Sequence, residues 1–155
     1  MFDIYEKSTK IVIMKKTNFV KRLMVALVLL VGVSVYADAG NVMTLRKGGS
    51  IVGKIEANGD VRINGSIKGR FESNGDIRVN GSIEGKIENN GDIRKRGSIV
   101  GKIEQNGDVR INGSIVGKVE NNGDIRKNGS IIGRVENMSN KRQAAVMYFF
   151  GFFAL

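Results

Sequence analysis

The 155-residue sequence contains no cysteine, histidine, proline or tryptophan. Without cysteine, the chain has neither a disulfide framework nor a thiolate nucleophile. Without histidine, it lacks the only side chain whose unperturbed pKa lies near neutral pH. The three tyrosines lie outside residues 43–138, so that region offers neither Trp nor Tyr for stacking against sugars. These absences disfavour enzymes that use Cys or His chemistry and weigh against sugar recognition.

The chain is rich instead in glycine, with 21 residues, and in one repeated segment of 16 residues. Residues 49–64 return with few changes in four further copies, at 65–80, 81–96, 97–112 and 113–128. Complementary half copies stand before and after them, at 44–50 and 129–137. A strict period without insertions predicts a symmetric repeat fold in which each unit packs against its neighbours.

Asn-Gly pairs indicate that each repeat forms short antiparallel hairpins, because a type I′ turn needs positive φ at both central residues. Five pairs follow a Lys-Ile-Glu type of segment, at 58–59, 74–75, 90–91, 106–107 and 122–123. Four pairs follow an Asp-Ile-Arg type of segment, at 64–65, 80–81, 112–113 and 128–129. Gly48-Gly49 and Arg96-Gly97 occupy the same position with weaker turn chemistry. The pattern predicts a continuous meander of short strands over residues 43–138.

Alternation with a period of two predicts which side chains face the core. Three sets of mostly β-branched residues are predicted to point inward: Ile51, Ile67, Ile83, Ile99, Ile115 and Ile131; Ile55, Phe71, Ile87, Ile103, Val119 and Val135; Leu45, Val61, Ile77, Ile93, Val109 and Ile125. Six glycines fall on the same side: Gly53, Gly69, Gly85, Gly101, Gly117 and Gly133. A side chain excluded at every copy indicates a close backbone approach near a symmetry axis, and a β-bulge is the alternative explanation.

The charged residues of the repeats alternate in sign, as in solvated β surfaces with cross-strand ion pairs. The formal net charge of +10 is spread along the chain, without the basic face that nucleic-acid binding requires. Gly48 to Lys54 resembles a phosphate-binding loop, but Ile55 replaces its Ser or Thr, and the segment is ordinary repeat text. The carboxylates recur in like environments beside Lys and Arg, whereas catalysis needs carboxyls in unlike ones. We therefore predict no catalytic, cofactor-binding or metal-binding residues and no enzyme.

The first 37 residues have the pattern of an export signal. Lys15, Lys16, Lys21 and Arg22 precede an apolar stretch at 23–35, and small residues precede a cleavage site after Ala37. Residues 14–37 are therefore predicted to be a signal peptide, with residues 1–13 as a mis-annotated extension before Met14. This pattern predicts an exported protein, located in the periplasm, at the cell surface or outside the cell.

Residues 139–155 form an apolar ending that contains five of the ten aromatic residues. Ser139 or Asn140 is suited to cap a short helix that leads into this run. A run of this length is too short to span a bilayer as a helix. The ending is predicted to close the β assembly as a cap, with peripheral membrane contact and an oligomer contact as alternatives. The aromatic residues concerned are Tyr148, Phe149, Phe150, Phe152 and Phe153.

The recurrent Asn-Gly-Asp-Ile-Arg-x-Asn-Gly-Ser-Ile-x-Gly-Lys-Ile-Glu text, followed by the aromatic ending, resembles the exported bacterial repeat proteins called five-fold β-flower proteins. The resemblance implies an all-β fold of hairpins arranged around an axis, closed like a flower or prism, and no assigned activity. It leaves the symmetry order open, because one type of hairpin occurs five times and the other six.

A weaker resemblance is to bactofilin-like cytoskeletal polymers, which also repeat Gly and Ile and imply a β-solenoid. The dense turn signals favour hairpins over solenoid coils. The sequence therefore predicts a non-enzymatic structural or interaction module of the cell envelope, whose partner is an envelope protein or polysaccharide. A multivalent binder of glycan or another envelope polymer and a bactofilin-like scaffold are the alternatives.

Overall fold

The computed structural model describes residues 42–155, so the predicted segments 1–13 and 14–37 lie outside the described residues. The described part is all-β apart from one short helix, as predicted. Its strands are β1 (Met43–Lys47), β2 (Ser50–Ile55), β3 (Asp60–Ile63), β4 (Ser66–Phe71), β5 (Asp76–Val79), β6 (Ser82–Ile87), β7 (Asp92–Lys95), β8 (Ser98–Ile103), β9 (Asp108–Ile111), β10 (Ser114–Val119), β11 (Asp124–Lys127) and β12 (Ser130–Glu136). The helix is α2 (Lys141–Phe149).

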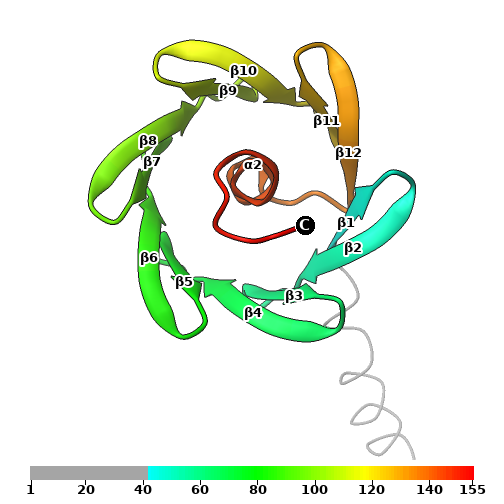
Figure 1. The fold of residues 1–155 in the computed structure, drawn as a ribbon, viewed down its shortest axis with the longest axis vertical. Coiled ribbons are helices and arrows are strands. Elements are labelled where there is room, and N and C mark those ends of the chain that lie inside the picture. Colours follow the sequence, from blue (N-terminus) through cyan, green and yellow to red (C-terminus); the bar gives the residue numbers. More distant parts are fainter. Residues whose placement is uncertain (1–41) are drawn as a thin grey trace, which may run out of the picture. The chain divides into compact units, whose positions relative to one another are not determined.

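The twelve strands form one closed, antiparallel barrel in which each strand pairs with its neighbours in the chain. β1 and β12 complete the ring, with Leu45 opposite Val135. Six hairpins therefore surround the central axis (Figure 1). The hairpin β1–β2 completes the six: the half copy before the repeats provides β1, and the first full copy provides β2. The structure is a closed ring of hairpins rather than the alternative β-solenoid.

The hairpin turns have the backbone conformation that the Asn-Gly pairs predict. Asn64 and Gly65, which join β3 to β4, have φ values of 50° and 79°. Positive φ at both residues is the requirement of a type I′ turn. Gly48-Gly49 and Arg96-Gly97 adopt the same conformation. We call the edge of the ring that carries these six turns the hairpin end.

The five other Asn-Gly pairs lie at the opposite edge, the junction end, and form a different kind of turn. At 56–60, which links β2 to β3, only Gly59 has positive φ, at 90°. The Gly59 amide donates to the Glu56 carbonyl at 2.9 Å, and the Glu56 amide donates to the Asp60 carbonyl at 2.8 Å. The prediction of type I′ turns is therefore wrong for these junction loops.

A β-bulge in every hairpin overturns one of the predicted inward sets. Leu45 pairs with Gly53, whereas the next residue, Arg46, pairs with Ile51, so Val52 is an extra residue in β2. An extra residue shifts the alternation and moves the side chains beyond it to the other face. The six isoleucines at this position therefore lie outside and are 52–54% exposed: Ile51, Ile67, Ile83, Ile99, Ile115 and Ile131.

The other two predicted sets do face inward. The set that includes Leu45 and Val61 is fully buried at all six positions, and the set that includes Ile55 is buried except for the half-buried Ile87. The six glycines also face inward. A Cβ added to any of them would collide with a main-chain carbonyl oxygen of the neighbouring strand. At Gly53, for example, the added Cβ would lie 2.6 Å from Arg62 O. Both explanations proposed for these glycines, a close approach and a bulge, therefore apply.

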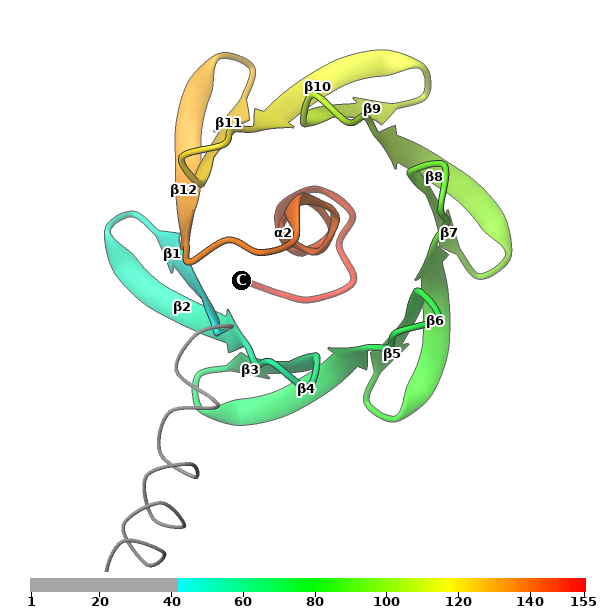
Figure 2. The same ribbon diagram turned by 180° about the vertical axis from the view of Figure 1, so that it is seen from behind.

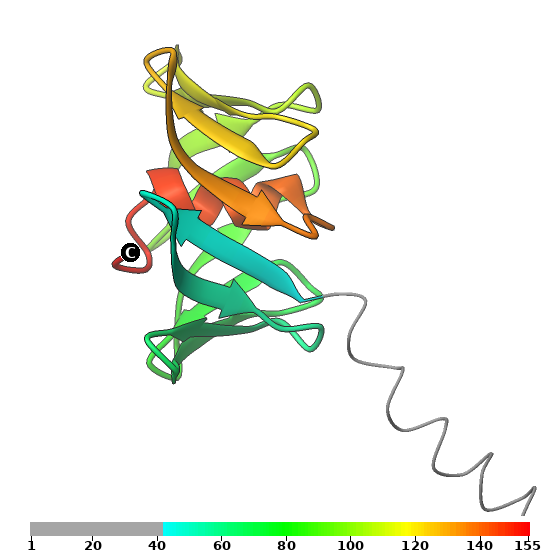
Figure 3. The same cartoon turned by 90° about the vertical axis from the view of Figure 1, so that its right-hand side faces the viewer.

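Helix α2 runs along the axis inside the ring (Figure 3). The chain leaves β12 at the junction end and reaches the centre through residues 137–140 (Figure 2). The Asn140 side chain caps the helix by accepting hydrogen bonds from the amides of Arg142 and Gln143, at 3.0 and 3.2 Å. The predicted cap residue is thus confirmed.

Candidate functional site

The interior of the ring is filled by matched pairs of glycine and aromatic residues. An added Cβ on each of five inward glycines would meet one aromatic ring from the C-terminal segment. The pairs are Gly133 with Tyr148, Gly117 with Phe149, Gly101 with Phe150, Gly85 with Phe152 and Gly69 with Phe153. The aromatic residues thus meet the hairpins in reverse chain order. At the sixth glycine, Gly53, the corresponding neighbours are Leu45 and Ile63 instead.

Gly151 allows this order to continue beyond the helix. It follows the C-cap residue Phe150 and has a φ of 61°, a left-handed conformation that favours glycine. The chain then leaves the helical path and curves around the inside of the ring (Figure 2). Phe152 and Phe153 thereby reach Gly85 in β6 and Gly69 in β4.

Polar contacts hold the C-terminal segment at both ends. At the junction end, the Arg142 guanidinium donates to the carbonyls of Glu88 and Asn89, at 3.3 and 3.0 Å. At the hairpin end, Lys95 Nζ donates to Gly151 O at 2.8 Å and lies 4.8 Å from the Phe152 ring centroid. Lys47 Nζ donates to Leu155 O at 3.1 Å. Lys95 also lies 3.4 Å from Phe150 O, so it places positive charge near the negative end of the helix dipole.

Tyr148 joins the segment to the strands that close the ring. Its hydroxyl lies 2.7 Å from Arg46 O in β1 and 3.2 Å from Arg134 O in β12. Burial raises the pKa of the Tyr148 hydroxyl to about 12. One side chain therefore contacts both strands of the closing pair.

This arrangement answers the predictions for the aromatic ending. The segment lies inside the ring, where Phe150, Phe152 and Phe153 are only 7–8% exposed, which is the arrangement that the predicted cap implies. The side chains named for the alternative of membrane contact, Tyr148, Phe149, Phe150, Phe152 and Phe153, pack against the inward glycines in this structure. Within residues 42–155, no helix is long and apolar enough to cross a membrane.

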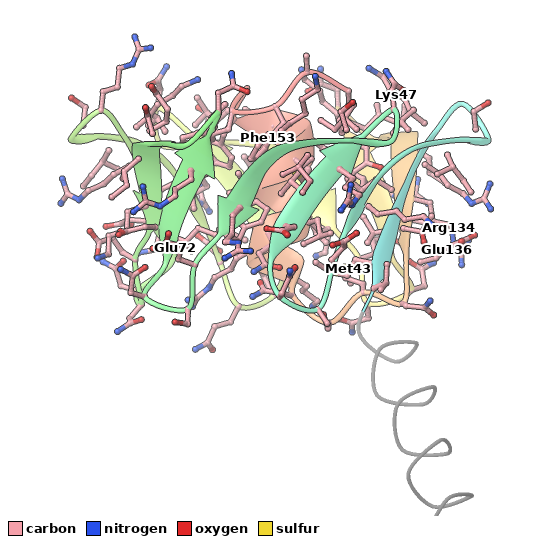
Figure 4. All side chains as sticks on the ribbon, turned by 90° about the horizontal axis from the view of Figure 1, so that it is seen from below. Met43, Lys47, Glu72, Arg134, Glu136 and Phe153 are labelled. Atoms are coloured by element: carbon pink, nitrogen blue, oxygen red, sulfur yellow. The ribbon has the colours of Figure 1, made fainter. Side chains whose placement is uncertain are left out.

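The outer wall carries a regular set of ion pairs. Each of the twelve carboxylates between residues 42 and 155 pairs with one Lys or Arg side chain. In one type, Arg110 pairs with Glu104 at 2.6 Å and also donates to Gly113 O in its own hairpin turn at 2.9 Å. Figure 4 shows such side chains around the wall, among them Arg134 and Glu136 of β12, which pair with Asp124 and Arg46 respectively. Exposed pairs of this kind contribute little stability individually.

In the second type of ion pair, the acid is an aspartate at the end of a junction loop, and its partner is the Lys or Arg opposite it in the next strand. The hydrogen bond from Arg70 is the main cause that lowers the pKa of Asp60. At Asp108, the hydrogen bond from Asn106 is the largest cause of the lowered pKa, followed by Lys118. A carboxylate with a lowered pKa stays ionised and is a poor general base. These two aspartates are therefore suited to ion pairing rather than to acid–base catalysis.

The sequence motif that resembles a phosphate-binding loop has a structural role. Gly48 and Gly49 form a hairpin turn and Lys54 lies in β2, so the phosphate-loop resemblance lacks the helix that such a loop requires. Among residues 42–155, no group of three or more His, Cys, Asp or Glu side chains is placed to hold a metal ion.

Near the junction end, a cleft of about 380 Å³ lies between Phe71 and Gln143. Glu56 and Glu72 at its rim are both paired with arginine.

The six exposed isoleucines, which we call the isoleucine ring, are the large apolar residues that remain exposed in the described part. Each lies in the second strand of its hairpin, directly after the serine that follows the turn. Their exposure varies by only two percentage points around the ring, from 52% to 54%. The isoleucine ring is therefore an apolar feature repeated with six-fold regularity on a charged wall.

Comparison with known families gives one match. The family model described as "Bactofilin: Polymer-forming cytoskeletal" matches residues 64–144, from the turn after β3 into α2. No curated protein and no solved structure matches the chain. The matched residues include four complete hairpins and the start of the central helix.

This match corrects the family resemblance and the location that were predicted from the sequence. The resemblance to five-fold β-flower proteins is wrong, since the matching family is a different one and the ring has six hairpins. The prediction of a secreted protein directed by a signal peptide, with a role at the envelope, is overturned because the family description is cytoskeletal. The stretch 14–37, on which that prediction rested, lies outside the described residues. The chain belongs to the bactofilin family of polymer-forming cytoskeletal proteins.

Proposed function

We propose that this protein is a non-enzymatic scaffold subunit that assembles with copies of itself through the isoleucine ring. The observation that carries the proposal is the exposure of six equivalent isoleucines on an otherwise charged wall. Monomeric soluble proteins do expose single apolar residues without consequence. Six identical ones at equivalent positions of a ring, in a family described as polymer-forming, support a contact surface.

The closed sheet restricts how copies can join. Open sheet edges allow chains to associate by adding strands. Here β1 pairs with β12, so no strand of the described ring has a free edge of that kind. Assembly must therefore use side chains, and the isoleucine ring supplies apolar ones.

The energies involved favour contacts that engage several isoleucines together. Completing the burial of one half-exposed isoleucine contributes roughly 1 kcal/mol. Association costs about 4–15 kcal/mol in lost translational and rotational freedom. A contact made by one hairpin is too weak, whereas several hairpins acting together reach the required range. Assembly should consequently depend steeply on the number of isoleucines that remain.

Substitution of these isoleucines by threonine tests the proposal. Threonine keeps β-branching and strand propensity while removing apolar surface. Variants changed at one, three and six positions should keep the melting temperature of the ring, because these side chains pack outside it. Polymer formation, measured by sedimentation and electron microscopy, should fall with each step and disappear in the six-fold variant.

A matched variant controls for general changes to the wall. Replacing exposed Ser50 and its equivalents by threonine alters the adjacent residue in the same strands without removing apolar area. It should assemble like the unmodified protein. Normal polymers from the six-fold isoleucine variant would refute the proposed contact surface.

A further inference from the structure

The nine Asn-Gly pairs of this chain fall into two structural classes that differ in their hydrogen bonds and in the burial of the glycine. Four lie in hairpin turns and five in junction loops. An Asn-Gly pair can lose ammonia when the glycine amide nitrogen attacks the asparagine side chain. The reaction requires a free side-chain amide, a free glycine nitrogen and water. The asparagines of both classes are exposed, but the classes differ in the hydrogen bonds of the side-chain amide and in the bonding and burial of the glycine nitrogen.

In the junction loops, the asparagine side chain is held by the aspartate two residues later. Asn106 Nδ2 donates to Asp108 Oδ2 at 2.9 Å, and Asn106 Oδ1 accepts from the Asp108 amide at 3.0 Å. The same pair of bonds occurs at Asn58, Asn74, Asn90 and Asn122. Both ends of the reacting amide are therefore occupied.

The attacking nitrogen in the junction loops is occupied as well. The Gly107 amide donates to Glu104 O at 3.0 Å, and the four equivalent glycines donate in the same way. Gly107 is buried, as are Gly59, Gly91 and Gly123, while Gly75 is half-buried. A nitrogen held in this way is directed away from the side chain that it would have to attack.

The hairpin turns show the opposite situation. Asn64 and Gly65 are both exposed, as are the equivalent pairs at 80–81, 112–113 and 128–129. In the described part of the chain, the side chains of these four asparagines and the amide nitrogens of the following glycines have no hydrogen-bond partner. The Gly65 carbonyl, by contrast, accepts a bond from Arg62 Nη1 at 3.3 Å, which keeps a guanidinium beside the turn.

We propose that Asn64, Asn80, Asn112 and Asn128 are sites of spontaneous deamidation, and that the folded junction loops protect the other five asparagines. At Asn64, the deprotonated Gly65 nitrogen attacks Cγ, a C–N bond forms, the Cγ–Nδ2 bond breaks and ammonia leaves. Water then opens the cyclic imide. Opening at one carbonyl gives aspartate, and opening at the other gives isoaspartate.

The consequence is a slow change of charge at the hairpin end of the ring. Each conversion turns a neutral amide into a carboxylate, so four conversions lower the formal net charge of +10 by four. Isoaspartate also adds a main-chain atom to a two-residue turn. The inference is independent of the proposed self-association, because it concerns the isolated ring.

Peptide mapping by mass spectrometry of the folded full-length protein, incubated at mildly alkaline pH, tests the proposal. The four hairpin-turn asparagines should gain the small mass increase that replacement of NH2 by OH gives. The five junction asparagines should remain intact over the same period. In chain unfolded by urea, all nine should convert at similar rates.

Two variants test the cause of the difference. N64R should remove one reactive site without loss of the hairpin, because Arg96 already occupies the equivalent position with a φ of 49°. D108A removes one of the two bonds that hold the Asn106 side chain, so Asn106 should become reactive while Asn90 stays intact. Equal conversion of both classes in folded protein would overturn the proposal. Hairpin-turn asparagines that stay intact when folded, while the unfolded chain reacts, would also overturn it.

Discussion

Phe152 packs so closely against Gly85 that a methyl group on the glycine would lie 2.5 Å from Cε1 of the aromatic ring. The same methyl group would also collide with the main-chain carbonyl of Arg94. Gly85 is therefore required by two neighbours, one from the adjacent strand and one from the C-terminal segment. The collision with a carbonyl of the adjacent strand occurs in all six hairpins, and the collision with an aromatic ring of the C-terminal segment occurs in five.

Replacing Gly85 by alanine should destabilise the ring by about 1–3 kcal/mol, the usual range for an overpacked core. Chemical denaturation of G85A against the unmodified protein measures this cost. In a background carrying F152A, the cost of G85A should be smaller because one of the two collisions is removed. G53A is the control, since Gly53 has no aromatic partner. Its cost should not change with F152A.

Truncation after Asn140 should remove most of the stability of the ring. The lost segment includes the buried Phe150, Phe152 and Phe153, and each buried Phe typically contributes about 3–5 kcal/mol relative to alanine. We expect a lower melting temperature, binding of hydrophobic dyes and aggregation without lipid. An unchanged melting temperature would show that the segment does not stabilise the fold.

Deletion of residues 81–96 should prevent formation of a stable ring, although it preserves an Asn-Gly turn by joining Asn80 to Gly97. The deletion removes β6 and β7 and with them Gly85, the partner of Phe152. A closed ring needs a fixed circumference, whereas an open repeat array loses stability gradually. Deleting residues 65–96 should therefore be no worse than deleting one repeat. A smooth, additive loss of unfolding free energy would contradict closure.

Titration of Tyr148 should weaken the protein at high pH. Its pKa is raised to about 12 in the folded state, from the ordinary tyrosine value of 10.0. Between these values the unfolded chain has released the proton and the folded chain has kept it. The unfolding free energy therefore falls as pH rises through this window and is unaffected by this group below it.

The variant Y148F isolates the effect of this hydroxyl from the contributions of all other groups. Unfolding free energies measured from pH 8 upwards should decline less steeply in Y148F than in the unmodified protein. Below pH 9, Y148F should be less stable by about 1 kcal/mol, because the bonds to Arg46 O and Arg134 O are lost. Parallel pH profiles would contradict the raised pKa.

Local sequence rules predict the strands, the hairpin turns and the helix cap of this fold, but not the face of every side chain. Alternation along 50–57 places Ile51 with Ile55, although a bulge lies between them. The hairpin turn contains the missing signal. A two-residue turn at 64–65 sets Arg62 opposite Ile67, and opposite residues share a face, so Ile67 must lie outside with the arginine.

The content of the ring's interior is predictable only in part. The thin core and the aromatic ending together predict a cap, and the ending does lie inside the ring. The pairing of each aromatic with one glycine depends on the angular position of each hairpin around the axis and on the turn at Gly151. These are properties of the closed ring, and no short stretch of sequence contains them.

The reverse order of the aromatic residues also bears on how such a gene can change. Genes made of near-identical units readily gain or lose a unit when they are copied. In this chain the number of aromatic residues in the C-terminal segment matches the number of repeat units, because five aromatic rings each pack against one glycine at a set position. A new unit would arrive without a partner in the segment, and a lost unit would leave one aromatic without its glycine. The copy number of the repeat is therefore constrained in inheritance by a segment that is not itself repeated.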